Sequence, residues 1–460
     1  MPKTAKLITP ALPHSQPAQR RCGSACRVWI AAPLGLLFCV ALTAAALADE
    51  FDEEPIRYSA SPGDNAVTKL QTKLELGQVQ MQYEKHFGYL RSVLKELGVS
   101  PESQMLVFSK TSLQRQRIAP RTPRAIYFGD DVYVGFCQNG EVMELSAVDP
   151  QLGAVFYTLD QTAAEKPRIA RQSDSCLICH GSSVTQGVPG HLVRSVYPDG
   201  SGLPILSSGS HRIDHSSPLQ NRWGGWYVTG THGAQTHLGN LIVRGRERPE
   251  SLDNAAGMNV TDLAERFKTS NYLTPHSDIV ALMVLEHQAE AHNRLARANF
   301  QTRQAIYHAA ALNRDLGYAA DHQWDSTASR IRSACEPLVN YLLMCNEAPL
   351  TAKIAGTSKF AAEFAAQGPR DPHGRSLREL DLERRLFKYP CSYLIYSPSY
   401  AGLPAEARQY VERRLWEVLA APQVAKDFAH LCDADRQAIR EILVATKPDL
   451  PDYWRAAAAE

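Results

Sequence analysis

The segment Cys176-Leu177-Ile178-Cys179-His180 constrains the fold of this chain more than any other stretch of its 460 residues. Two thiols separated by two residues, with an imidazole directly after the second, fit the C-x-x-C-H pattern of covalent haem attachment. In that chemistry each sulfur forms a thioether with one haem vinyl group, and the histidine supplies the proximal imidazole to the iron. The spacing therefore predicts a single turn of chain that presents Cys176, Cys179 and His180 to one haem c. Gly181 lets the backbone pass close to the ring.

Two other roles for the cysteine pair stay open from the sequence. A thioredoxin-like dithiol requires the pair to open a helix within a βαβ unit, and the polar residues 166–175 do not have the pattern of a buried strand. A zinc site requires a second pair of ligands. His211 and His215 offer one, but 31 residues separate Cys179 from His211, which is wider than the usual finger spacing. The spacing favours haem attachment.

The first 48 residues predict a secretory signal peptide. They contain five basic side chains and no acidic one, and residues 28–48 form an uncharged apolar run that ends on Ala46-Leu47-Ala48. We therefore expect residues 1–48 to be removed and the protein to be periplasmic or otherwise exported. An uncleaved N-terminal anchor is the alternative.

The chain that follows the leader has no feature of a nucleic-acid or membrane-spanning protein. It contains 44 basic and 48 acidic side chains, a formal charge of −4, which predicts no nucleic-acid partner. No later stretch is apolar enough for a transmembrane segment. In an exported protein the remaining cysteines are possible disulfide partners, with at least one left unpaired because their number is odd. These cysteines are Cys137, Cys335, Cys345, Cys391 and Cys432.

The periodicity of the sequence predicts an α+β, helix-dominated fold in three segments after the leader. Residues 49–165 combine a helix over 64–97 with four β-branched and aromatic runs, separated by turn signals, that predict a small antiparallel sheet. Residues 166–260 are rich in Gly, Ser, Pro and His and predict a loop-rich haem-binding segment. Residues 261–460 predict a helical region. Its first helix is long and has Asp278 as a suitable N-cap, and further helices are expected near 328–345, 358–367, 376–387, 404–419 and 433–446.

Four stretches of the sequence resemble a functionally uncharacterised group of exported bacterial proteins described as cytochrome c domain-containing. They are RAIYFGDDVYVGF, CLICHGSS, RWGGWYVTGTHG and LFKYPCSYLIYS. This resemblance spans most of residues 100–420 and implies haem binding without a defined reaction. The similarity to a small cytochrome c is confined to the motif, because no methionine lies between Met143 and Met258 to serve as the sixth iron ligand.

Histidines are the alternative sixth ligands, since nine of the fifteen fall between residues 180 and 292. Two lie in a glycine-rich segment that also contains Trp223 and Trp226. The long helix adds a histidine and a methionine on an apolar face, where core packing is the default role. The candidate sixth ligands are Met283, His287, His232 and His237. Glu286 is a weaker candidate for an acid or base, and His211 and His215 are expected on a surface loop.

Three functions are compatible with a single covalent haem. The first is a c-type haem protein that transfers electrons to a redox partner protein. The second is a haem redox enzyme, peroxidase-like or a small-molecule reductase or oxidase, with an open distal site. The third is a haem-based sensor or respiratory subunit. The transfer of a single electron does not require a chain of about 410 residues, which favours the enzyme. The sequence has no other catalytic motif, however. We therefore expect the electron carrier.

Overall fold

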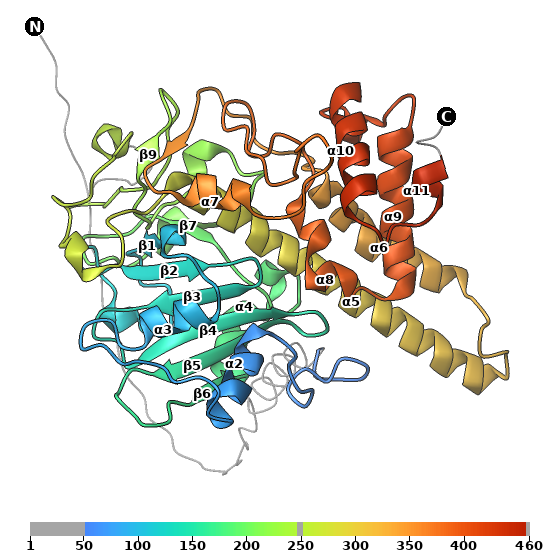
Figure 1. Ribbon diagram of the computed structural model, residues 1–460, viewed down its shortest axis with the longest axis horizontal. Coiled ribbons are helices and arrows are strands. Elements are labelled where there is room, and N and C mark those ends of the chain that lie inside the picture. The colour runs from blue at the N-terminus through green and yellow to red at the C-terminus, as the bar shows by residue number, and fades with distance from the viewer. Residues whose placement is uncertain (1–50, 246–251, 457–460) are drawn as a thin grey trace, which may run out of the picture. The chain divides into compact units, whose positions relative to one another are not determined.

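Six antiparallel strands form the main sheet of the computed structural model, which describes residues 51–245 and 252–456 (Figure 1). Each strand pairs with its neighbour in the chain. The strands are β1 (Met105–Val107), β2 (Arg124–Phe128), β3 (Val132–Phe136), β4 (Val142–Asp149), β5 (Gly153–Asp160) and β6 (Ile169–Gln172). Asn139 and Gly153 adopt left-handed backbone conformations (φ 52° and 68°) at two of the turns. The predicted antiparallel sheet and the mixed α+β class are confirmed.

β6 is a strand that the sequence did not predict. It pairs with β5 at the edge of the sheet, and three of its four residues are only half-buried. Because an edge strand needs no continuous apolar run, the polar segment ahead of Cys176 still forms one. Its antiparallel pairing differs from the parallel βαβ unit of a thioredoxin-like protein.

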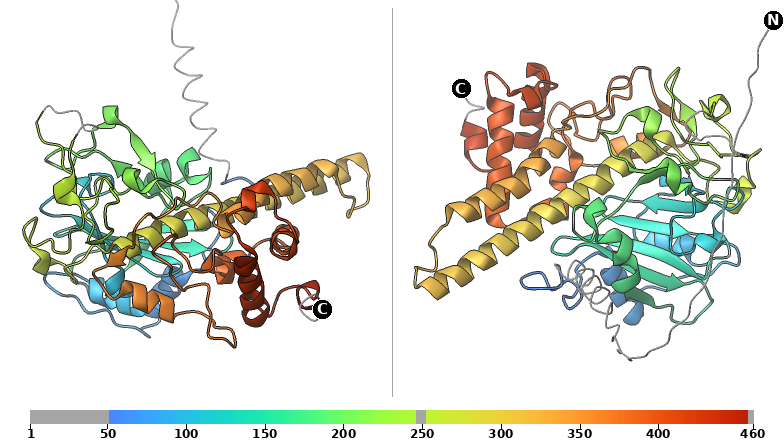
Figure 2. Two further views of the ribbon diagram at one scale, coloured as in Figure 1. Left: turned by 90° about the horizontal axis from the view of Figure 1, so that it is seen from above. Right: turned by 180° about the vertical axis from the view of Figure 1, so that it is seen from behind.

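The two faces of the sheet are covered by different helices, because side chains alternate along each strand. Met143 and Leu145 of β4 join one hydrophobic cluster with residues of the N-terminal helices. Glu144, between them, points to the opposite face. The elements on the first face are α2 (Ala66–Glu75) and α3 (Leu90–Glu96), and those on the second are α4 (Asp174–His180) and α5 (Ile279–Leu316) (Figure 2).

The helix predicted over residues 64–97 is two helices. A capping box at Asn65 starts α2, where the side chain accepts hydrogen bonds from the N–H groups of Val67 and Thr68. Gly77 and Gly88 adopt left-handed conformations (φ 68° and 55°) in the segment between α2 and α3. A left-handed glycine ends a helix, so the two glycines divide the apolar pattern.

The middle segment, residues 166–260, is loop-rich as predicted. Apart from α4, the regular structure over the described residues 166–245 and 252–260 consists of single 3₁₀ turns and short strands. The strand pairs are β7 (Arg194–Val196) with β8 (Ser210–Arg212), and β9 (Gly230–Thr231) with β10 (Ala355–Gly356).

α5 is a single helix of 38 residues, as the sequence predicted. Asp278 caps it by accepting hydrogen bonds from the N–H groups of Val280 and Ala281, and Gly317 (φ 70°) follows its last turn. α6 (Asp325–Leu342) returns along α5, and the hairpin they form extends beyond the sheet (Figures 1 and 2).

Shorter helices complete the C-terminal region. They are α7 (Phe360–Ala366), α8 (Pro398–Ala401), α9 (Ala405–Ala420), α10 (Asp433–Thr446) and α11 (Tyr453–Ala456). The helix predicted over 376–387 is wrong: this segment forms turns and a bridge between Leu380 and Phe387. Two of its arginines pair with distant partners, Arg378 with Asp130 and Arg385 with Asp435, beside a local pair of Arg384 with Asp381.

The disulfides expected among the non-motif cysteines are absent from the part of the chain that the structure describes, where every cysteine is free. Burial raises the pKa of four thiols to about 12, so they pack as protonated, apolar side chains. These are Cys137, Cys335, Cys345 and Cys391. Cys432 is exposed and caps α10.

The predicted leader, residues 1–48, lies outside the described residues. The three segments expected after it all fall within one compact unit, Ala48–Glu460. Between residues 51 and 456, wherever the structure is described, no helix combines the length and the apolar character needed to cross a membrane.

Candidate functional site

α4 carries the whole motif and begins directly after β6. Ser173 occupies its N-cap position, and Asp174 lies in the first turn, where a carboxylate interacts favourably with the helix dipole. Cys176 and Cys179 are three residues apart, so their side chains lie on the same side of the helix. His180 is the last helical residue. One short helix therefore presents the two thiols and the imidazole together.

The His180 ring is oriented by a hydrogen bond to the backbone. Its Nδ1 lies 2.9 Å from the carbonyl oxygen of Gly190, and the Gly190 N–H donates in turn to the His180 carbonyl oxygen at 2.8 Å. A carbonyl can only accept, so Nδ1 carries the proton and Nε2 is the nitrogen left to bind a metal. The Phe156 ring lies 4.8 Å from the imidazole, centroid to centroid. Burial lowers the pKa of His180, which keeps the ring neutral at pH 7.

The two thiols are accessible and unpaired. Cys176 is half-buried and Cys179 is exposed, and the intervening Ile178 exposes 79% of its surface. Burial is the main cause that raises the pKa of Cys176. Free thiols on one side of a helix, beside a neutral imidazole protonated on Nδ1, are the groups that covalent haem attachment uses. The residues present therefore fit a haem c.

The sheet face next to α4 carries a fixed pair of charges. The Arg124 guanidinium crosses over Gly135, where a side chain would overlap it, and reaches Glu144 at 2.5 Å. Ser112 and Gln114 also donate to Glu144, at 3.3 and 3.2 Å. The Arg124 charge lowers the pKa of His180 and the Glu144 charge raises it, and burial remains the main cause of the shift.

Gly181 is also closely packed within the protein. A Cβ at this position would lie 3.0 Å from both the Leu177 carbonyl oxygen and the Phe51 ring. The loop that follows is closed by buried Thr185, whose hydroxyl group donates to backbone carbonyl oxygens including that of Val188 at 2.8 Å.

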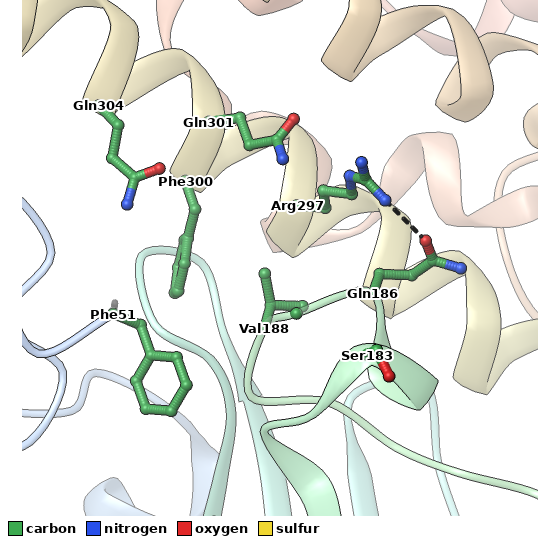
Figure 3. A pocket seen from close by; sticks show the side chains of 9 residues that line it. Phe51, Ser183, Gln186, Val188, Arg297, Phe300, Gln301 and Gln304 are labelled. Carbon is green, nitrogen blue, oxygen red and sulfur yellow. Dashed lines mark hydrogen bonds between the residues drawn. The ribbon is translucent and has the colours of Figure 1, made fainter. Parts of the chain in front are cut away.

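A cavity of about 250 Å³ separates this loop from α5 (Figure 3). Phe51, Val188 and Phe300 form its apolar side, and Arg297 on α5 forms a hydrogen bond to Gln186 of the loop at 2.9 Å. The loop therefore contacts α5 through polar side chains around this cavity.

His232 and His237 lie side by side, as their sequence positions suggest, with ring centroids 4.7 Å apart. The Nε2 atom of His232 accepts a hydrogen bond from the N–H of Asn259 at 3.0 Å. His237 packs against Trp223, and burial lowers its pKa to about 3. Across the described residues, these hydrogen bonds and ring contacts are made with segments other than α4 and its loop.

Met283 and His287 lie in the core on α5, the default role for its apolar face. His287 uses both ring nitrogens: Nδ1 lies 2.8 Å from Nδ1 of His215, and Nε2 lies 2.8 Å from the Ser392 hydroxyl group. Tyr341 stacks on both imidazoles. Iron ligation by His287 would require one of these hydrogen bonds to break.

The surface position predicted for His215 is wrong. Of the two histidines, His211 is exposed and His215 is buried. The sequence did not indicate this burial, because the partner of His215, His287, lies 72 residues further along the chain. The neighbouring Glu286 forms a buried ion pair with Arg222 and accepts a hydrogen bond from the Trp223 indole at 3.1 Å. These contacts are made within the core, and they hold Glu286 in place through Arg222 and Trp223.

A second polar group near the motif was missed by the sequence reasoning. The ring centroids of His191 and Tyr133 lie 4.0 Å apart, and Nε2 of His191 lies 2.8 Å from the Ser146 hydroxyl oxygen. The Tyr133 hydroxyl oxygen lies 3.0 Å from Nδ1 of His292. Strand alternation was the available signal, since Tyr133 and Ser146 are opposite each other on β3 and β4 and share the face next to α4.

No protein-family model, curated protein or solved structure matches this chain. The site is therefore defined by its own geometry: a mixed α+β fold in which the edge of an antiparallel sheet leads into a helix bearing two free thiols and an oriented imidazole.

Proposed function

We propose that this chain is an exported, periplasmic c-type haem protein. One haem is attached through Cys176 and Cys179, His180 is the proximal iron ligand, and the protein transfers electrons to and from a redox partner protein. No role in nucleic-acid binding is proposed.

The observation that carries this proposal is the hydrogen bond from His180 Nδ1 to the Gly190 carbonyl oxygen, 2.9 Å long. It makes Nε2 the free nitrogen, and a backbone carbonyl in this position raises the basicity of a metal-bound imidazole. Such a bond also prevents the ring from turning.

The haem iron, when bound, supplies a centre that gains and loses one electron. His180 binds through Nε2 and retains the proton on Nδ1. Phe156 shields one side of the imidazole from water. Arg124 and Glu144 neutralise each other on the adjacent sheet face, so neither leaves an unpaired charge near the ligand.

A haem redox enzyme with an open distal site is the second candidate. It is favoured by the environment of the candidate sixth ligands, since Met283 lies in the core and both ring nitrogens of His287 are already hydrogen-bonded. The addition of carbon monoxide to the reduced protein separates the two functions. An unchanged spectrum supports the electron carrier with two protein ligands, and a shifted spectrum supports the enzyme or a sensor.

Haem attachment is tested by expressing the full chain in a host with haem-ligation machinery. We expect the intact mass to include one haem, and the cleavage site at residue 48 to be read from the same spectrum. The double variant Cys176→Ser/Cys179→Ser should release its haem into acid acetone. Cys432→Ser is the matched control, because Cys432 is also free and exposed but caps α10, outside the motif. A wild-type mass without haem would refute the proposal.

A further inference from the structure

We infer that Asn293 on α5 is a positioning residue for His180. It fixes the peptide group whose carbonyl oxygen orients the imidazole. This inference rests on the proposed haem function and extends it to the control of the iron ligand.

The two shortest hydrogen bonds of the Asn293 side chain are made with one backbone segment, and a longer one at 3.4 Å is donated to Glu290. Asn293 is 1% exposed, its Oδ1 accepts a hydrogen bond from the His191 N–H at 2.8 Å, and its Nδ2 donates to the His191 carbonyl oxygen at 2.8 Å. One buried amide therefore holds the backbone on both sides of His191.

The first of these hydrogen bonds acts on His180 through a single peptide group. The His191 N–H and the Gly190 C=O belong to one planar peptide unit. Asn293 accepts from the N–H end of this unit, and His180 Nδ1 donates to its oxygen end. Hydrogen bonds at the two ends of a peptide polarise each other, so the contact from Asn293 strengthens the one to His180.

The contact between Asn293 and this backbone depends on the absence of a side chain at Gly190. A Cβ at Gly190 would overlap Oδ1 of Asn293, so the glycine lets the amide reach the backbone. Any side chain at this position would displace the asparagine.

A second contact ties the same loop to the same face of α5. Gln186 donates to Glu290 at 2.9 Å. It also accepts from Arg297 at 2.9 Å (Figure 3). Glu290, Asn293 and Arg297 are spaced by three and four residues, which places them on one helix face. The loop between His180 and His191, here called the ligand loop, is thus anchored at two points on the 38-residue helix α5.

Loss of the Asn293 amide should weaken the bond at Nδ1 and raise the reduction potential. A weaker Nδ1–H···O bond makes Nε2 a poorer electron donor, which stabilises ferrous over ferric iron. We expect Asn293→Ala to increase the ratio of reduced to oxidised protein, at a fixed potential, by about 3- to 10-fold. This corresponds to an upward shift of about 28–59 mV for a one-electron couple.

The experiment is a spectroelectrochemical titration of the haem-loaded full chain, with low-temperature electron paramagnetic resonance of the ferric form. Asn299→Ala is the matched control. Asn299 lies six residues further along α5, is 2% exposed, and donates to the carbonyl oxygens of Pro150 and Gly402 at 3.1 and 3.0 Å. The Asn299→Ala variant loses a comparable buried amide that does not contact the ligand loop.

A shift in Asn293→Ala that is absent from Asn299→Ala supports the inference. Equal potentials in both variants overturn it, as do equal shifts in both. If Asn293→Ala does not fold, Gln186→Ala replaces it with a smaller shift expected in the same direction, and no shift there overturns the inference. A wild-type chain without haem would instead refute the proposed function, on which this inference depends.

Discussion

Acidification should remove the stability that this fold derives from imidazoles buried in the neutral form. Burial lowers the pKa of His215 to about 3, with the nearby Arg222 charge acting in the same direction. Burial also lowers the pKa of His237 to about 3, with a further contribution from His232. Both side chains are at most 3% exposed, so solvent screens neither shift appreciably.

The pH window follows from the difference between the folded and unfolded states. An unfolded histidine has a pKa of about 6.5. Between pH 6.5 and about 3, the unfolded chain therefore binds a proton at each site that the folded chain does not, and stability falls as the pH falls. From pH 7.5 to 5.5 each site should cost about 1.4 kcal/mol, or roughly 2.7 kcal/mol for the pair. Burial lowers the pKa of His191 and His287 in the same direction. Burial also raises the pKa of Glu286, of Glu290 and, to about 7, of Glu347, and these carboxyls act with the opposite sign, so the histidine contribution is isolated by comparing variants.

Urea unfolding at pH 7.5, 6.5 and 5.5 measures this loss. His215→Gln should reduce the difference between pH 7.5 and 5.5 by about 1.4 kcal/mol, because one of the titrating sites is gone. His211→Gln should leave the difference unchanged, since His211 is exposed on β8. A difference between pH 7.5 and 5.5 that His215→Gln leaves unchanged, or equal reductions in the two variants, would refute the reasoning.

Three further changes test the packing around α5. Asp278→Ala removes a buried carboxylate that caps α5 and binds the 357–358 backbone, and should lower the free energy of unfolding in urea by roughly 3–4 kcal/mol; a loss below 1 kcal/mol would contradict this. Glu286→Ala strands the Arg222 charge and should cost about 3–5 kcal/mol, while adding Arg222→Met should cost little more, so fully additive losses would argue against the ion pair. Gly190→Ala should cost about 1–3 kcal/mol, because its methyl group meets a buried amide, whereas Gly200→Ala has open space and should be near neutral in the same assay.

The secondary structure was predictable where local signals and tertiary environment agree. Asp278 and the apolar period after it predicted α5, because capping and helix periodicity involve neighbours within a few residues. The antiparallel sheet was predictable for the same reason, since its strands are joined by tight turns and pair in chain order. The segment 376–387 failed this test because Arg378 and Arg385 bind distant carboxylates.

The chemistry available at the site follows from the sequence alone: two thiols and an imidazole, in an order and spacing that suit one cofactor. The sequence could not determine which nitrogen of His180 is free, because that depends on the orientation of the Gly190 peptide and on Asn293, 113 positions further along the chain. It also could not distinguish buried His215 from exposed His211, four residues apart in one segment. Side-chain type is a property of the chain, but burial and hydrogen-bond partners arise only when remote segments are packed together.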